Sequence, residues 1–354
     1  MLVLRLFRIN LKGAQHAPAN LREWVDFQLK KNGNLMKKYI ILIIIAAFAW
    51  VCAAQEKISV PAEPGFWQSI ANFFLPHADA RQILLEKQTL YFLVTVEKGE
   101  NGWRHLVFNP NRGSQGIWNP ESPDELLSNY CKYTALFLQG IDQYPRKVLF
   151  IGLGAGIMPR FVRKISPATG IDIVEIDGEI PGIAEQYFGF KKDDKINITI
   201  GDGRDFINRN KTRYDIIFID AYNAENIPFQ LTTEEFFRKI RESLTPGGIM
   251  TANVANLGKP DFIAAELKTV KSVFPDLAVF VCPGQSNYML FAPVNRKFDS
   301  AEVKIKCREI EDSSNPELDF RSMLDTRMSD EEISKITSGA MILKDDFAPV
   351  ENMK

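Results

Sequence analysis

Short apolar segments alternate with helix-like segments through the second half of the chain, and this alternation restricts the fold more than any other feature of the sequence. Five apolar segments are predicted strands: KVLFI at 147–151, IDIVEI at 171–176, INITI at 196–200, YDIIFI at 214–219 and GIMTANV at 248–254. Helices are expected to begin near Ile157, Glu179, Thr232 and Pro260. Strands that alternate with helices form a parallel sheet covered on both faces, so the sequence predicts a doubly wound α/β fold.

Two further strands change the end of this sheet. The segments LAVFVC at 277–282 and NYMLFAPV at 287–294 are separated only by PGQS. Such a short connection cannot cross over the sheet, so these two strands must be antiparallel. A mostly parallel sheet that ends in an antiparallel hairpin is the methyltransferase-type variant of the Rossmann fold.

A smaller β-rich region precedes this sheet. The segments QTLYFLVTVEKG at 88–99 and RHLVFNP at 104–110 are typical of strands joined by a turn at ENG, and they predict a small antiparallel sheet within 80–118. Ser122 and Pro123 then fit the N-cap and first turn of a helix that continues through SPDELLSNYCKYTALFLQGI.

The segment 36–54, MKKYIILIIIAAFAWVCAA, has a basic start, an apolar run and a small-residue end. This is the layout of a secretory signal peptide, and an uncleaved membrane anchor is the alternative. Residues 1–35 resemble neither a signal nor a compact domain, so we interpret Met36 as the true start; a genuine N-terminal tail before an internal anchor is the other interpretation. The protein is expected at the membrane or exported, and in the cytoplasm if this segment is not used.

The chain is therefore predicted to have five parts. These are a leader at 1–35, the signal peptide or anchor at 36–54, a helix and small β domain at 55–120, a Rossmann-like domain at 121–298, and a charged helical tail at 299–354.

Charge and residue types exclude several kinds of site. Lysine and arginine total 43 and aspartate and glutamate 44, and this balance argues against a nucleic-acid surface. The four cysteines have no metal-ligand spacing, so no metal is expected. The three histidines, His16, His77 and His105, all precede the glycine-rich region. Chemistry in that region would therefore use carboxylates, hydroxyls or amides.

Three glycines at alternate positions follow the first predicted strand of the large sheet. Gly152, Gly154 and Gly156 lie at the edge where ligands bind in open α/β sheets. The dinucleotide pattern GxGxxG would need its third glycine at Ile157, so this fingerprint is not met. The spacing suits a nucleoside without a pyrophosphate, and an ordinary tight strand-to-helix turn is the alternative.

Carboxylates follow the next three strands. Glu175 and Asp177 end the second strand, where a carboxylate can accept both ribose hydroxyls; a solvated charge is the alternative. Asp202, between Gly201 and Gly203, can reach an adenine amino group, and a helix N-cap is the alternative. Asp220 ends the fourth strand. Together with the glycine loop, these carboxylates indicate a nucleoside site.

Over residues 82–294 the chain resembles the spermidine synthase family, the polyamine aminopropyltransferases, in its divergent bacterial branch. The resemblance lies in VLFIGLGAG, IVEID, GDGRDFI, YDIIFIDAY, IPFQLTTEEFF and LTPGGIMTANV. It implies a transferase that moves an aminopropyl group from decarboxylated S-adenosylmethionine to a putrescine-like polyamine acceptor, without a metal. It also suggests a homodimer.

The resemblance also assigns site residues. It implies that Asp220 takes the proton of the attacking amine; the alternative is an aspartate that ends this strand, as in many methyltransferase-like sheets, without acting as a base. For the nucleoside it implies Gly152, Gly154, Gly156, Glu175, Asp177, Asp202 and Gly203, and for the amine Tyr91, Tyr222 and Asn223.

The amine half departs from the family pattern. Where members carry Asp-Ser-Ser-Asp or Asp-Ser-Thr-Asp, this chain has Asp220-Ala221-Tyr222-Asn223, so the second carboxylate has become Asn223. The usual Tyr-His-Glu is absent, and Phe92 replaces the glutamine that normally follows the tyrosine equivalent to Tyr91. Asp345 and Asp346, in LKDDFAPVE, are candidates to replace the lost charge; an exposed acidic tail is the alternative.

Two other functions fit the same residues. One is an S-adenosylmethionine-dependent methyltransferase on the same fold. The other is a non-catalytic protein that binds a nucleoside or a polyamine. Export favours the second, because decarboxylated S-adenosylmethionine is a cytoplasmic metabolite.

Overall fold

The structure, a computed structural model, describes residues 81–109, 114–138, 145–221, 228–255, 259–284, 287–299 and 319–347. The predicted leader and the signal or anchor segment at 36–54 lie outside these ranges, as do Tyr222 and Asn223. No helix within the described ranges is long and apolar enough to cross a membrane.

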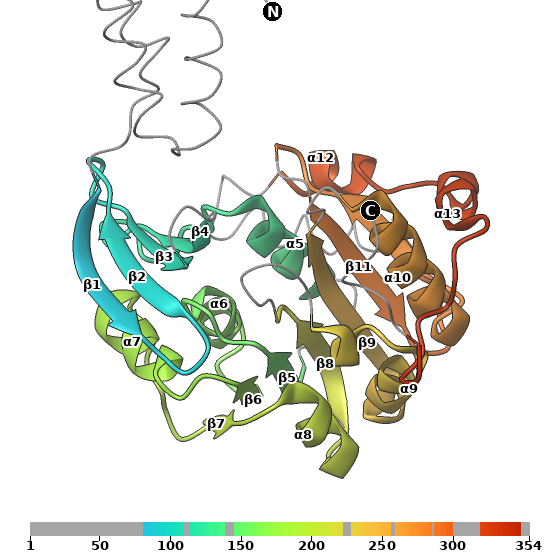
Figure 1. The fold of residues 1–354 in the computed structure, drawn as a ribbon, viewed down its shortest axis with the longest axis horizontal. Coiled ribbons are helices and arrows are strands. Elements are labelled where there is room, and N and C mark those ends of the chain that lie inside the picture. Colours follow the sequence, from blue (N-terminus) through green and yellow to red (C-terminus); the bar gives the residue numbers. More distant parts are fainter. Residues whose placement is uncertain are drawn as a thin grey trace, which may run out of the picture. The chain divides into compact units, whose positions relative to one another are not determined.

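The predicted small antiparallel sheet is present and has four strands (Figure 1). In sheet order these are β1 (Gln82–Gln88), β2 (Leu93–Lys98), β3 (Arg104–Phe108) and β4 (Ser114–Trp118). The ENG turn is confirmed by the hydrogen bond from Gly99 N–H to the Trp103 carbonyl. The single strand expected at 88–99 is wrong in its first part: the Thr89 hydroxyl accepts hydrogen bonds from the N–H groups of Tyr91 and Phe92 and closes a turn there.

The large sheet confirms the predicted fold class. Its strands are β5 (Lys147–Ile151), β6 (Gly170–Glu175), β7 (Ile196–Ile200), β8 (Tyr214–Ile219), β9 (Leu244–Ala255), β10 (Ala278–Val281) and β11 (Asn287–Pro293). They lie in the order β10-β11-β9-β8-β5-β6-β7. Strand β11 is antiparallel to both β9 and β10, and the pairs from β9 to β7 are parallel. This is the predicted methyltransferase-type arrangement.

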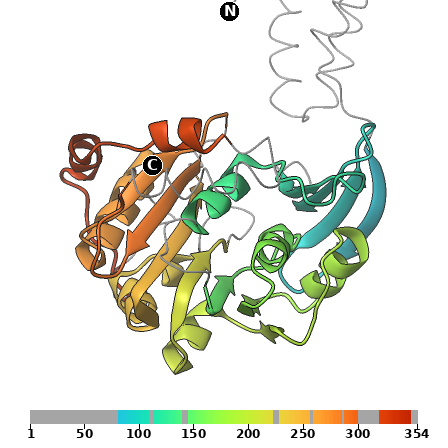
Figure 2. The same ribbon diagram turned by 180° about the vertical axis from the view of Figure 1, so that it is seen from behind.

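Helices cover both faces of the large sheet (Figure 2). One face carries α5 (Asn129–Leu138), α6 (Ile157–Ile165), α7 (Ile180–Tyr187) and α12 (Phe320–Asp325). The other carries α8 (Gly203–Arg209), α9 (Glu234–Glu242), α10 (Pro260–Val273) and α13 (Asp330–Thr337). Residues therefore alternate between two cores along each central strand. Phe150 of β5, for example, belongs to the first core and Leu149 to the second.

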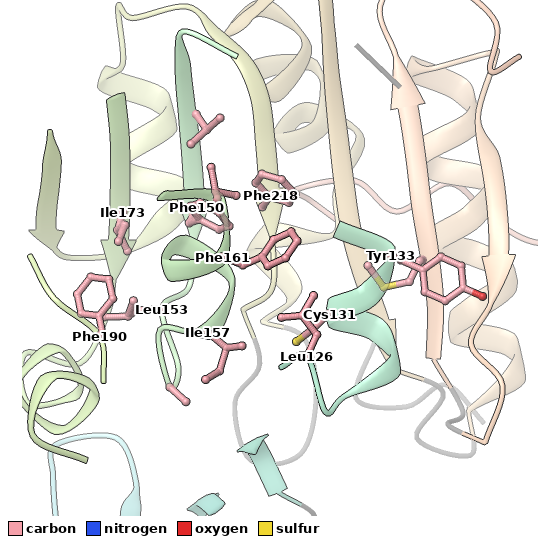
Figure 3. Close-up of a cluster of buried hydrophobic side chains, with 14 of the residues drawn as sticks. Leu126, Cys131, Tyr133, Phe150, Leu153, Ile157, Phe161, Ile173, Phe190 and Phe218 are labelled. Carbon is pink, nitrogen blue, oxygen red and sulfur yellow. The ribbon is translucent and has the colours of Figure 1, made fainter. Parts of the chain in front are cut away.

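The first core joins the large sheet to the small one. Phe150 and Phe218 stack with their ring centroids 4.5 Å apart, and Figure 3 shows them beside Phe161 of α6. Val94 and Leu106 of the small sheet belong to the same cluster of buried side chains. The small sheet is thus packed into the core of the domain that carries the glycine loop.

The predicted helix starts near Ile157, Glu179 and Pro260 are confirmed, and the one near Thr232 lies at Glu234 behind the N-cap Thr233. The start at Ser122 and Pro123 is wrong, because α5 begins at Asn129. The Ser122 carbonyl instead closes a turn with Glu125 N–H, and the Pro123 carbonyl accepts the indole N–H of Trp118 at 3.2 Å.

The first prediction concerns the glycine that directly follows β5. Gly152 has φ +99°, and a Cβ there would lie 2.2 Å from the Asp220 carbonyl oxygen, whereas a Cβ on Gly154 (φ +54°) would meet no atom within 4 Å. We expect Gly154→Ala to lower the free energy of unfolding by about 1–2 kcal/mol, through backbone strain alone. Gly152→Ala adds a backbone clash and should cost about 3 kcal/mol or more. Urea denaturation measures both, and equal losses would contradict the packing described here.

Candidate active site

The glycine loop between β5 and α6 takes its shape from three glycines in the left-handed region. Gly152, Gly154 and Gly156 have φ values of +99°, +54° and +70°. Two of them are required by the protein's own atoms: Gly152 packs against the Asp220 backbone, and a Cβ on Gly156 would lie 2.9 Å from the Phe190 ring. A Cβ on Gly154 would meet no atom of the described residues within 4 Å. The loop therefore has one open position, where a ligand can approach the backbone closely.

Glu175, at the tip of β6, binds this loop. Its side chain is buried, with Oε2 accepting from Leu153 N–H at 2.9 Å and Oε1 from Asp177 N–H at 3.0 Å. Burial raises the pKa of Glu175, and these backbone hydrogen bonds oppose that shift. A carboxylate offers about four lone-pair positions, so Glu175 retains capacity for ribose hydroxyls while it holds the loop.

Asp177 lies two residues beyond. Its Oδ1 accepts from Glu179 N–H at 3.0 Å at the start of α7. Its Oδ2 is buried and has no hydrogen-bond partner within the described ranges. Buried polar atoms are normally paired, so this oxygen is available to a bound ligand.

Asp202 adopts the capping role that was the alternative in the sequence. Its Oδ1 accepts from Asp205 N–H at 3.0 Å at the start of α8, and its Oδ2 accepts from the Gln230 amide at 3.3 Å. Contact with adenine stays a prediction for Asp202. Gly203 is explained by packing, since a Cβ there would lie 2.6 Å from Ile151. A hollow of about 660 Å³ lies between β7 and α8, with Thr199, Asp202 and Tyr214 in its lining.

Asp220 follows β8 and lies directly beside the glycine loop. Its backbone N–H donates to the Ile151 carbonyl at 3.0 Å, and its half-buried side chain accepts from Asn253 Nδ2 at 2.9 Å through Oδ1. Burial raises the pKa of Asp220 to about 6, and the Asn253 hydrogen bond acts in the opposite direction. The structure thus brings Glu175, Asp177 and Asp220 together around one loop.

Tyr91 and Phe92 have different surroundings. Tyr91 is 44% exposed in the turn between β1 and β2. Lys87, just before that turn, forms an ion pair with Glu179 at the start of α7, so the turn lies near the tip of β6. Phe92 is buried and stacks on Phe108 with ring centroids 4.5 Å apart. Phe92, at the position where family members carry glutamine, therefore contributes to the core of this protein.

The expectation that Asp345 replaces the charge lost at Asn223 is corrected. The Asp345 carboxylate pairs with Arg204 of α8 and accepts the Thr233 hydroxyl at 2.6 Å, so its charge is already balanced. Asp346 is exposed, as the alternative had it. The tail does fold onto the domain, because Leu343 is buried and its N–H donates to the Thr269 hydroxyl at 2.9 Å.

Four polar residues at this site were not foreseen: Arg204, Gln230, Asn253 and Asn287. Asn287 donates to Asn253 Oδ1 at 2.8 Å, and Arg204 also donates to the Gln230 carbonyl at 3.2 Å. Among the described residues no group of His, Cys, Asp or Glu is arranged to hold a metal ion.

Comparison with known proteins identifies the family. The sequence profile of the spermine/spermidine synthase domain matches residues 133–304. A polyamine aminopropyltransferase from Vibrio vulnificus is 32% identical over 211 residues, which cover 58% of this chain and 69% of the relative. The chain belongs to the spermine/spermidine synthase family. This family member is therefore a transferase.

This chain matches a smaller share of the length of two other relatives. A probable polyamine aminopropyl transferase from Bifidobacterium longum is 30% identical over 248 residues, or 67% of this chain and 55% of the relative. The human eEF1A lysine and N-terminal methyltransferase is 32% identical over 167 residues, or 43% of this chain and 24% of that protein.

Solved structures share the fold. A probable spermidine synthase from Corynebacterium glutamicum has a TM-score of 0.61 at 22% identity and covers 75% of this chain and 97% of its own. A spermidine synthase in complex with the transition state analogue AdoDATO has a TM-score of 0.55 at 19% identity and covers 73% of this chain and 87% of its own.

The second prediction concerns nucleoside binding. Glu175→Gln removes the charge and places an amide among the N–H groups of Leu153 and Asp177. Charge-assisted hydrogen bonds contribute about 1.5–3 kcal/mol, so we expect the affinity for 5′-methylthioadenosine to fall about tenfold or more. Calorimetry measures this. Glu185→Gln, at an exposed position of α7, is the matched control and should leave the affinity unchanged. Equal affinities in all three proteins would refute the role of Glu175.

Proposed function

We propose that this family member is an aminopropyltransferase that moves an aminopropyl group from decarboxylated S-adenosylmethionine to a polyamine acceptor. One observation carries the proposal. Among the described residues, none forms a hydrogen bond with Asp220 Oδ2, and the Asp220 backbone lies against the same glycine loop that Glu175 binds. A proton acceptor beside a nucleoside loop is the arrangement that amine alkylation by a nucleoside sulfonium needs.

The donor, the acceptor amine and Asp220 account for every bond and proton that changes in the reaction. The lone pair of a neutral amine attacks the methylene carbon attached to the sulfonium, and a C–N bond forms as the C–S bond breaks. Both electrons of the C–S bond leave with the sulfur, which becomes the neutral thioether of 5′-methylthioadenosine. The new ammonium loses a proton to Asp220, whose negative charge also stabilises the cation as it develops.

The comparisons support the donor and the acceptor at the level of class. A spermidine synthase with the same fold binds AdoDATO, described as a transition state analogue, and the Vibrio vulnificus relative is a polyamine aminopropyltransferase. We infer that the nucleoside lies over Gly154 with its ribose on Glu175. The acceptor amine then approaches Asp220, which Tyr222 and Asn223 follow in the sequence.

A mixture of putrescine with either decarboxylated S-adenosylmethionine or S-adenosylmethionine tests the proposal. Mass analysis should find an aminopropyl unit added to the diamine with the first donor and no product with the second. A methyl group added with the second donor would instead establish a methyltransferase. The similarity to the human methyltransferase is the observation behind this second candidate. No product with either donor would contradict both.

The third prediction separates chemistry from binding. Asp220→Asn removes the proton acceptor but keeps a polar side chain beside Asn253. General base catalysis contributes about 10²–10⁴-fold, so the turnover number should fall by at least about a hundredfold. The affinity for 5′-methylthioadenosine should stay within about twofold of wild type, because the base acts in the chemical step. Asp194→Asn, at an exposed position, is the control. Loss of nucleoside affinity in Asp220→Asn would show that Asp220 is a binding residue.

The fourth prediction concerns pH. The base must be ionised, and the pKa of Asp220 is raised by burial to about 6. In a pH range where the protonation states of both substrates do not change, kcat/KM should therefore fall about tenfold per pH unit below about 6. Above this pH it should level off. The pH–rate profile measures this limb. A limb that remains in Asp220→Asn at reduced rate would assign it to another group.

A further inference from the structure

Two side-chain amides form a row of hydrogen bonds that ends at Asp220. The row runs from β11 through β9 to the end of β8. Asn287 Nδ2 of β11 donates to Asn253 Oδ1 of β9 at 2.8 Å, and Asn253 Nδ2 donates to Asp220 Oδ1 at 2.9 Å. The sheet register produces this row, because Ile219 of β8 pairs with Ala252 and places Asp220 beside Asn253. Asn253 in turn pairs with Met289, two residues from Asn287.

The direction of the row is fixed at Asp220, whose ionised carboxylate can only accept, and the Asn287 donor stabilises it. A side-chain amide has a donating and an accepting side, and it can turn over in place. The Asn287 amide donates to Asn253, so the carbonyl side of Asn253 must face Asn287. The NH₂ side of Asn253 then faces Asp220 as a donor. Asn253 is buried, which favours this single hydrogen-bonded orientation.

We propose that Asn253 and Asn287 are positioning residues for Asp220, which hold Oδ1 in place and leave Oδ2 for the amine of the acceptor. This inference rests on the proposed function for its catalytic meaning. Asn287 acts at one remove: its donor to the Asn253 carbonyl stabilises the orientation in which the NH₂ side of Asn253 contacts Asp220. The row thus favours the ionised carboxylate that a proton acceptor needs.

Among the described residues, the other titratable groups around Asp220 do not supply this effect. Cys131 of α5 interacts electrostatically with Asp220, but burial raises the pKa of its thiol far above its usual range. Cys282, close to Cys131, has a thiol pKa raised by burial to about 12, and Tyr130 hydrogen-bonds to Cys131. The two thiols therefore stay neutral near pH 7. The Asn253 donor is therefore the group that opposes the effect of burial on the pKa of Asp220.

Substitutions at position 287 test the row without touching Asp220. A carboxylate there can only accept, so Asn287→Asp should turn the Asn253 amide over and present its carbonyl to Asp220. Protonated Asp220 would then be favoured. We expect its pKa to rise by at least about one unit in Asn287→Asp and less in Asn287→Ala, which removes the donor to the Asn253 carbonyl. Asn287→Gln keeps a donor and should stay nearest to wild type.

The readout is the titration of the Asp220 carboxyl carbon by NMR with ¹³C-labelled aspartate, assigned by its loss in Asp220→Asn. Turnover at pH 6 should fall about fivefold or more in Asn287→Asp, with an acceptor KM within about threefold, and should recover at higher pH. Asn197→Ala is the matched control, because Asn197 donates to Asp172 at 3.1 Å in another Asn–Asp pair of the same sheet. This substitution should leave the pKa of Asp220 unchanged.

The outcomes separate this inference from the proposed function. An Asp220 pKa that is the same in wild type, Asn287→Asp and Asn287→Ala overturns the inference, whatever the activity. A pKa that shifts as expected supports the row even if no aminopropyl transfer is found in any variant, and that lack of transfer would count against the proposed function alone. Lost turnover with an unchanged Asp220 titration shows a merely structural role for Asn287 and overturns the inference as well.

Discussion

The contact between the glycine loop and the tips of β6 and β8 supports everything else at this site. The loop has no side chain at Gly152 to anchor it, so its neighbours hold its backbone. Gly152 N–H donates to the Val174 carbonyl at 2.8 Å, and Leu153 N–H donates to Glu175. On the other side, Gly152 packs against the Asp220 backbone so closely that no Cβ fits. The nucleoside loop, the expected ribose ligand and the expected base therefore form one connected unit.

The two halves proposed for this site, one for the nucleoside and one for the amine, are held by different means. The nucleoside half is fixed by backbone groups and capped helices, with Glu175, Asp177 and Asp202 all engaged by main-chain N–H groups. The C-terminal tail adds to this half through Asp345 and Arg204 of α8. The amine half depends on side-chain amides, because Asp220 accepts a hydrogen bond from Asn253, which accepts one from Asn287. This difference matches the sequence, which retains the nucleoside motifs of the family and departs from its polyamine motifs.

The sequence predicted the large sheet well because its central strands are buried on both faces and read as unbroken apolar runs. It missed β1, an edge strand whose residues are mostly exposed and carry no alternating pattern. The start of α5 was misplaced because a tertiary contact, from the Trp118 indole to the Pro123 carbonyl, is not visible in local capping signals. The carboxylates at the strand tips were found from their positions. Asn253 and Asn287 were not, because their partners lie more than thirty residues away in the chain and only the strand register brings them together.

We propose that one site holds both the nucleoside and the acceptor amine, and a crystal structure with 5′-methylthioadenosine and putrescine would show whether it does. We expect the ribose hydroxyls on Glu175, the nucleoside over Gly154, and an amine nitrogen about 3 Å from Asp220 Oδ2 and facing the thioether sulfur. A nucleoside bound instead in the hollow between β7 and α8, or a diamine bound away from Asp220, would contradict it.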